Sequence, residues 1–184
     1  MIYPIVVYGS PVLRKKAPPV AKDYPNLNQF VTDLFETMEK SDGIGLAAPQ
    51  VGRSIRIFVI DASALADEHP ELNGFRKAFI NPQIVERSDE ISTYNEGCLS
   101  LPTIREELER PSKIKISYVD EDFITHEESY DGIIARIIQH EYDHLDGILL
   151  VDHLNPLKRK MLEGKLKAIS KGKVETAYKI KTAV

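Results

Sequence analysis

Apolar residues recur at the spacing of an amphipathic helix between Asn26 and Gly43. The expected buried stripe of this helix consists of Leu27, Phe30, Val31, Leu34, Phe35 and Met38. Asn26 and Gln29 stand at the two positions of a capping box, and Gly43 marks the far end. The pattern therefore predicts an N-terminal helix.

Two further helices are expected in the second half of the chain. Asp131 stands where a cap would begin a strongly apolar helix that ends near Gly147. Asn155 as a cap, with Pro156 at the first helical position, predicts a C-terminal helix that runs to about Ser170.

Strand patterns separate these helices. Residues 55–61 are rich in β-branched and aromatic side chains, and residues 77–86 are similar, with Pro82 indicating an edge or a bulge. Residues 113–120 alternate apolar with polar and are expected to form a hairpin with residues 123–130. Because strands come early and helices flank them without regular alternation, the predicted class is α+β with a mostly antiparallel sheet.

The chain has 184 residues, and we expect a single domain over residues 1–184, with 62–76 as a polar loop and 172–184 as a candidate flexible tail. A net charge of -4 argues against a DNA-coating protein. The first residues resemble neither a signal peptide nor a membrane span, so no membrane partner is expected. A single cysteine excludes an internal disulfide and favours the cytoplasm.

The motif HEYDH, residues 140–144, is the strongest chemical signal. Two histidines four apart on a helix lie on one face, so His140 and His144 can bind one metal ion. Glu141 then stands where a carboxylate can act as general base on a water. This helix would be the central metal-binding element around which the sheet packs.

Two histidines leave a catalytic metal site one protein ligand short. His69, His126 and His153 are each more typical of surface histidines. Cys98, in EGCLS, is by default a small buried hydrophobe, although its thiolate beside two imidazoles would also suit a divalent metal.

The glycine-rich segment 43–52 is most simply a connection between a helix and a strand. Alternatively, its glycines let a peptide backbone approach closely, with Gln50 as a neutral hydrogen-bond donor.

Taken together and in this order, the three segments resemble the signature motifs of the peptide deformylases. The family pattern G-x-G-x-A-A-x-Q, E-G-C-x-S and H-E-x-x-H is met without a gap by Gly43, Gly45, Ala47, Ala48, Gln50, Glu96, Gly97, Cys98, Ser100, His140, Glu141 and His144. The likeness extends over roughly residues 1–170. Tyr94, the length of segment 62–76 and the tail after Gly172 depart from it.

The resemblance implies a hydrolase that removes the N-formyl group from the terminal methionine of new peptides and releases formate. It implies that Cys98, His140 and His144 hold one divalent metal, Fe²⁺ in the cell, with Zn²⁺ or Ni²⁺ accepted in preparations. A water on the metal would attack the formyl carbon with Glu141 as general base and acid. The Gln50 side chain and the Leu99 backbone N–H would stabilise the oxyanion.

For the substrate, Ile44, Ile133 and Ile137 are expected to line a pocket for the methionine side chain, although both helix isoleucines could equally belong to the core. Residues Gly43 to Gly45 would bond the peptide backbone in extended form. By family likeness, Arg105 would contact the peptide chain or carboxylates.

Two rival hypotheses are weaker. A zinc protease would continue with a further histidine in H-E-x-x-H-x-x-G-x-x-H, which does not follow His144. A structural metal module would use four ligands, mostly cysteines, and would have no need of Glu141.

The last helix carries a concentration of basic residues: Lys158, Arg159, Lys160, Lys165, Lys167, Lys171 and Lys173. A solvated helix face is the ordinary meaning of such a run. With Leu157, Met161, Leu166 and Ile169 anchoring one side, and by analogy with some deformylases, we expect weak ribosome association through this helix.

Overall fold

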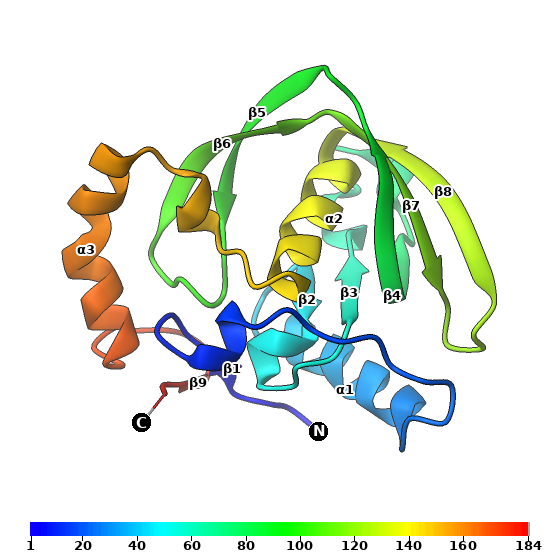
Figure 1. Ribbon diagram of the computed structural model, residues 1–184, viewed down its shortest axis with the longest axis horizontal. Coiled ribbons are helices and arrows are strands. Elements are labelled where there is room, and N and C mark those ends of the chain that lie inside the picture. The colour runs from blue at the N-terminus through cyan, green and yellow to red at the C-terminus, as the bar shows by residue number, and fades with distance from the viewer. Residues whose placement is uncertain (184) are drawn as a thin grey trace.

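The computed structural model describes residues 1–183, and the described chain folds as an α+β protein with mostly antiparallel strands (Figure 1). Its α-helices and strands are β1 Ile5–Val6, α1 Leu27–Lys40, β2 Gly45–Ala47, β3 Ile57–Asp61, β4 Arg76–Arg87, β5 Ile91–Gly97, β6 Arg105–Pro111, β7 Lys113–Val119, β8 Thr125–Asp131, α2 Gly132–Leu145, α3 Pro156–Ser170 and β9 Ile180–Lys181. The predicted class, with an N-terminal and a C-terminal helix, is confirmed.

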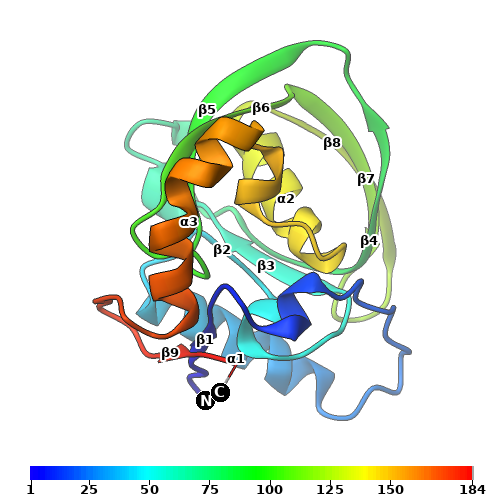
Figure 2. The same ribbon diagram turned by 60° about the vertical axis from the view of Figure 1, so that its left-hand side comes forward.

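Within residues 1–183 the strands form three sheets. The largest has the order β2-β3-β4-β7-β8 with every neighbouring pair antiparallel. Strands β5 and β6 form a separate antiparallel hairpin, and β1 pairs in parallel with β9. Helix α2 runs between the large sheet and the β5–β6 hairpin, so strands surround it on several sides (Figures 1 and 2).

The core is built on both faces of the large sheet. Successive side chains of a strand point to opposite faces, and in β3 the side chains of Ile57 and Val59 pack with those of α1. Phe58 and Ile60 alternate with them and pack with residues of α2. All four are fully buried. Helices α1 and α2 therefore cover opposite faces of one sheet, and α2 is packed directly against the sheet.

Several local predictions are confirmed and some are wrong. The hairpin of β7 and β8 forms, and Asn155 caps α3, where its side-chain oxygen accepts a hydrogen bond from the Lys158 N–H. Pro82 lies within the first of two register shifts in β4, between Ile80 and Gln83, so it occupies a bulge of a central strand rather than an edge. The capping box at Asn26 is wrong, because its φ of 56° is left-handed rather than the extended backbone that a capping side chain needs.

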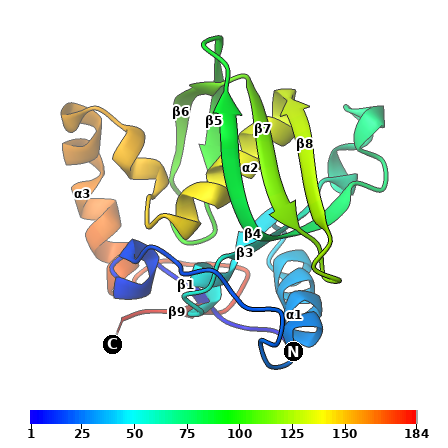
Figure 3. The same ribbon diagram turned by 45° about the vertical axis from the view of Figure 1, so that its right-hand side comes forward.

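The C-terminal helix also differs from expectation. Leu166 and Ile169 are buried as predicted, but Leu157 and Met161 are 70% and 76% exposed. Only the second half of α3 packs on the body of the molecule, while its first half projects outward (Figures 1 and 3). The four apolar residues therefore do not form one buried stripe.

The loop and the tail have structure of their own. Segment 62–76 contains two short 3₁₀ helices, Ser63–Leu65 and Pro70–Leu72. Residues after Gly172 run back to β1, beside which they form β9. None of the helices within residues 1–183 is long and apolar enough to cross a membrane.

Candidate functional site

Helix α2 and the turn after β5 bring together three side chains that could bind a metal ion. His140 and His144 lie one helical turn apart, and Cys98 directly follows the last residue of β5. One ligand atom from each residue lies within 4.8 Å of the others, and Cys98 Sγ is 3.4 Å from His144 Nε2. A sulfur and two imidazole nitrogens form a donor set that suits a borderline divalent metal and leaves a coordination position open.

The electrostatics of this cluster favour a thiolate. Burial by itself would raise the pKa of the Cys98 thiol, but the charge of His144 and hydrogen bonds with both histidines lower it to about 5. A thiolate, and not a thiol, is the form of cysteine that binds metals. The default assignment of Cys98 as an inert buried residue therefore does not fit its surroundings.

Glu141 is buried beside the same three residues. Among the residues that the structure describes, its Oε2 atom has no hydrogen-bond partner, and neither has His144 Nδ1. Burial raises the pKa of Glu141 to about 7, against the opposing charges of His140 and His144. A buried carboxylate oxygen without a partner is costly, so this geometry leaves an acceptor available for a bound molecule.

Strand β2 passes unusually close to Glu141 because Gly45 has no side chain. A Cβ atom at Gly45 would lie 2.6 Å from Glu141 Oε1 and 2.8 Å from its Cγ and Cδ atoms. At Gly43 a Cβ atom would lie 2.9 Å from Leu99 Cδ1. The glycines of the first motif thus bring a backbone strand against the cluster.

A buried ionic network, which was not anticipated from the sequence, holds the first histidine. Glu96 accepts a hydrogen bond from His140 Nδ1 at 2.8 Å. The same carboxylate accepts two hydrogen bonds from Arg110, at 2.7 and 3.0 Å, and one from Arg136 at 2.8 Å. Burial would raise the pKa of Glu96, but the bonds from His140 and Arg110 hold it well below its usual range. The His140 ring is thereby fixed with its Nε2 atom free to face the cluster.

The network continues toward the surface. Arg110 also donates to Asp143 at 2.8 Å, and Asp143 accepts from His153 at 2.7 Å. Arg136 could have been suspected from the sequence, since it lies four residues before His140 within an otherwise apolar run. Arg110 gave no such signal, because its partners come from β5 and α2, far away in the chain.

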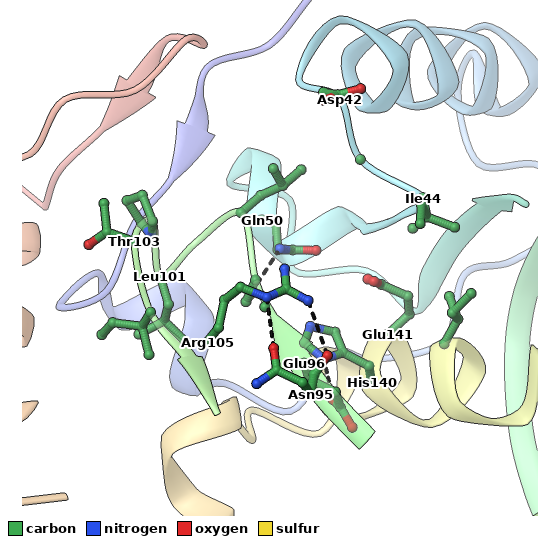
Figure 4. Close-up of a pocket in the computed structure, with 18 of the residues that line it drawn as sticks. Asp42, Ile44, Gln50, Asn95, Glu96, Leu101, Thr103, Arg105, His140 and Glu141 are labelled. Carbon is green, nitrogen blue, oxygen red and sulfur yellow. Dashed lines mark hydrogen bonds and ion pairs between the residues drawn. The ribbon is translucent and has the colours of Figure 1, made fainter. Parts of the chain in front are cut away.

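Gln50 lies in a 3₁₀ helix, Ala48–Val51, with its amide aimed at the cluster (Figure 4). The Ala47 N–H donates to Gln50 Oε1 at 2.9 Å, which turns the Nε2 group toward Ser100 Oγ at 3.2 Å and Cys98 Sγ at 3.7 Å. Gln50 is therefore an oriented, neutral donor next to the thiolate.

A cavity of about 580 Å³ opens over these groups. Ile44, Ile133 and Ile137 line this cavity, and all three also pack at the edge of the core. The two helix isoleucines therefore belong both to the cavity wall and to the core. Arg105 extends across the opening and donates to the side chain and the backbone carbonyl of Asn95 (Figure 4). The predicted site residues that line the cavity are Gly43, Ile44, Gly45, Gln50, Cys98, Leu99, Arg105, Ile133, Ile137, His140 and Glu141.

The other three histidines lie outside the cluster. His126 pairs with Asp120 at 2.7 Å, His153 pairs with Asp143, and His69 lies near Glu71 in the 62–76 loop. Tyr94, which departs from the family pattern, is 48% exposed and lines the cavity rim.

Comparison with known proteins gives one family. The model of the family described as polypeptide deformylase matches residues 2–160, so residues 161–184 lie beyond the match. The peptide deformylase of Flavobacterium johnsoniae is 47% identical over 100% of this chain and 97% of its own length, and that of Cytophaga hutchinsonii is 49% identical over 98% and 97%. The structure of the Thermus thermophilus peptide deformylase is similar with a TM-score of 0.83 at 39% identity, over 94% of this chain and 99% of that one.

Proposed function

Because the chain belongs to the polypeptide deformylase family, and is therefore a metal-dependent hydrolase of formylated peptides, we propose that Cys98, His140 and His144 hold its metal and that Glu141 transfers the proton. One observation carries this assignment. The three ligand atoms lie within 4.8 Å of one another, and the unpartnered, buried carboxylate oxygen of Glu141 lies beside them.

The donor set fits the metal that the family requires. A thiolate and two imidazoles bind Fe²⁺, Ni²⁺ and Zn²⁺, and affinity alone does not select strongly among them. We propose Fe²⁺ in the cell, with Zn²⁺ or Ni²⁺ occupying the site in preparations. Since a thiolate that lines an open cavity can be oxidised, activity with iron should depend on exclusion of oxygen. When bound, the metal supplies Lewis acidity toward water and the formyl carbonyl.

Glu141 moves the proton in this scheme. Its carboxylate accepts a proton from the attacking water and then delivers it to the nitrogen of the leaving amine. A pKa near neutrality suits both halves of that task, and burial raises the pKa of Glu141 to about 7. Gly45 allows the carboxylate to lie directly against the backbone of β2, where a substrate backbone would pass.

Two donors would stabilise the oxyanion that forms at the formyl carbon. The Gln50 amide is held by Ala47 with its N–H groups toward Cys98, and the Leu99 N–H follows Cys98 directly. Preorganised donors of this kind typically contribute about 3 to 4 kcal/mol each to lowering the barrier.

The cavity would hold the peptide. Ile44, Ile133 and Ile137 offer an apolar wall for an unbranched methionine side chain. The backbone of Gly43 to Gly45 can bond an extended peptide in the manner of an added strand. Arg105 lies at the opening, where its guanidinium can give up its hydrogen bonds to Asn95 and donate to the peptide chain instead.

We further propose a cytoplasmic location and weak ribosome docking through α3. The unpaired Cys98 suits a reducing compartment. Helix α3 projects from the body with exposed lysines around Leu157 and Met161. Cosedimentation with ribosomes should be lost when Lys160, Lys165 and Lys167 are changed to glutamate, and also at high salt. Charge reversal of Lys15, Lys16 and Lys22 is the matched control; equal binding by both variants would place the contact elsewhere.

The catalytic proposal is tested by formate release from formyl-Met-Ala-Ser, with acetyl-Met-Ala-Ser and an internal peptide as controls. Formate should be released only from the formyl peptide, should stop after chelation, and should return with added Fe²⁺, Ni²⁺ or Zn²⁺. Cleavage of the internal peptide would instead indicate a metallopeptidase.

A further inference from the structure

The chain after α3 returns to the mouth of the catalytic cavity. Strand β9 pairs in parallel with β1, with the Ile5 N–H donating to Lys179 O at 2.8 Å and the Val7 N–H to Lys181 O at 3.0 Å. Figures 1 and 2 show this segment passing from the end of α3 to lie beside β1. Just before β9, the cavity wall includes Glu175, Thr176, Ala177 and Tyr178.

Tyr178 makes the most specific contact of this segment. Its hydroxyl donates to the backbone carbonyl of Leu99 at 2.8 Å, and its partly buried ring, like the Leu99 side chain, packs against the core cluster that includes residues of α1. The Thr176 hydroxyl donates to the Tyr178 carbonyl at 2.6 Å, which fixes the backbone that carries the ring. Burial, aided by the charge of Cys98, raises the pKa of Tyr178 to about 12, so its hydroxyl remains a donor at neutral pH.

The segment that follows Cys98 is held from three elements. Tyr178 holds Leu99 O, the Tyr8 N–H donates to Ser100 O at 2.9 Å, and Gln50 Nε2 donates to Ser100 Oγ at 3.2 Å. The N–H and the C=O of Leu99 belong to consecutive peptide planes that share one Cα atom. The plane that contains the Leu99 N–H also contains the Cys98 carbonyl, which accepts a hydrogen bond from the Leu101 N–H at 3.0 Å. Because each peptide unit is planar, this bond and the Tyr178 bond hold the planes on both sides of the Leu99 Cα atom.

We propose that Tyr178 is a positioning residue, which fixes the Leu99 backbone so that its N–H is oriented in advance toward the formyl oxygen. The inference rests on the proposed role of the Leu99 N–H as an oxyanion donor. It assigns a catalytic purpose to a segment beyond the family match. A donor contributes most when it needs no reorganisation during the reaction, and a tyrosine hydroxyl on its carbonyl supplies that constraint.

The test is Tyr178→Phe, which keeps the ring and removes the hydroxyl. Hydrolysis of formyl-Met-Ala-Ser should show kcat lowered about tenfold with KM nearly unchanged, less than the roughly hundredfold or greater loss on deleting a donor outright. Tyr3→Phe is the matched control, because the Tyr3 hydroxyl donates to Asp33 at 3.3 Å, outside the cavity lining. It should leave kcat unchanged. Thr176→Val, which frees the Tyr178 backbone, should lower kcat in the same direction by less.

The outcomes separate the inference from the function on which it rests. If the native chain releases formate and Tyr178→Phe matches its kcat, Tyr178 merely fastens the tail, and the inference is overturned. A raised KM at unchanged kcat also overturns it, since the segment would then act only as a wall for the peptide. No formate release by the native chain would contradict the proposed function itself. Thermal unfolding of each variant verifies that the fold is retained.

Discussion

Helices α2 and α3 have 14 and 15 residues and both carry many polar side chains, yet they occupy opposite environments. In α2 even Arg136, Gln139, Glu141 and His144 are buried, whereas in α3 only Leu166 and Ile169 are. A buried charge must be paired or it becomes costly. The polar groups of α2 are therefore tied into defined geometry, and the two buried atoms without a partner in the described chain, Glu141 Oε2 and His144 Nδ1, lie at the proposed reaction centre. The lysines of α3 are exposed, apart from the surface pair that Lys158 makes with Glu106, so water imposes no such order on them.

Among substitutions that test this difference between the buried polar groups of α2 and the exposed ones of α3, the largest effect is expected at Glu141. Glu141→Gln keeps the shape of the side chain but cannot accept a proton, so formate release should fall by about a hundredfold to ten-thousandfold. Metal content should stay close to that of the native chain, because Glu141 is not one of the three clustered ligands. Formate release and bound metal are measured on the same sample; near-native turnover with metal bound would remove the general-base role.

Arg110 tests whether the buried network supports the ligands. Arg110→Met leaves Glu96 and Asp143 short of a buried partner and should lower the free energy of unfolding by about 3 to 5 kcal/mol. It should also weaken metal binding by about tenfold to a hundredfold. The matched control is Arg14→Met, which breaks the partly exposed pair with Asp152 and should cost no more than about 1 kcal/mol. Equal losses in denaturant unfolding would refute the distinction.

Packing differs between the helices in the same way. Ile138 on α2 is fully buried, and Ile138→Ala should lower the free energy of unfolding by about 2 to 5 kcal/mol. Met161 on α3 is 76% exposed, and Met161→Ala should change it by no more than about 0.5 kcal/mol. The urea midpoints of the two variants measure this difference. A large loss of unfolding free energy in Met161→Ala would mean that the exposed face of α3 is covered in solution.

The smallest effect concerns substrate choice. A substrate whose first side chain cannot be buried against Ile44, Ile133 and Ile137 loses about 1.5 to 3 kcal/mol of binding free energy in the transition state. Formyl-Met peptides should therefore exceed formyl-Asp peptides in kcat/KM by roughly tenfold to over a hundredfold. Equal values for the two peptides would show that this wall does not select the first residue.

The same contrast explains what could be predicted from the sequence. The pair His140 and His144 is encoded by local spacing on one helix, and β3 is encoded by its own run of apolar residues, so both were accessible. Arg110 and Glu96 meet across a hairpin that was not predicted, because most side chains of β5 and β6 are exposed and lack an apolar alternation. Pairing between distant segments is set by tertiary packing and leaves little local signal.

The errors have a similar origin. The side chain of Asn26 suits a helix cap, but the backbone there is left-handed, and the side chain makes no capping hydrogen bond. Leu157 and Met161 have helical spacing, but their side chains are exposed in the structure. The sequence predicted a flexible tail over residues 172–184, because the pairing of β9 with β1 and the Tyr178 contact, which place the described part of that tail, leave no local pattern.

The most direct test of the account is an anomalous-scattering map of crystals grown with the metal retained, recorded at its absorption edge. The account predicts one peak, about 2.3 Å from Cys98 Sγ and about 2.1 Å from a ring nitrogen of His140 and of His144, with the Glu141 carboxylate outside the ligand distance. A peak elsewhere, or a peak bound by Glu141 in place of Cys98, would contradict it.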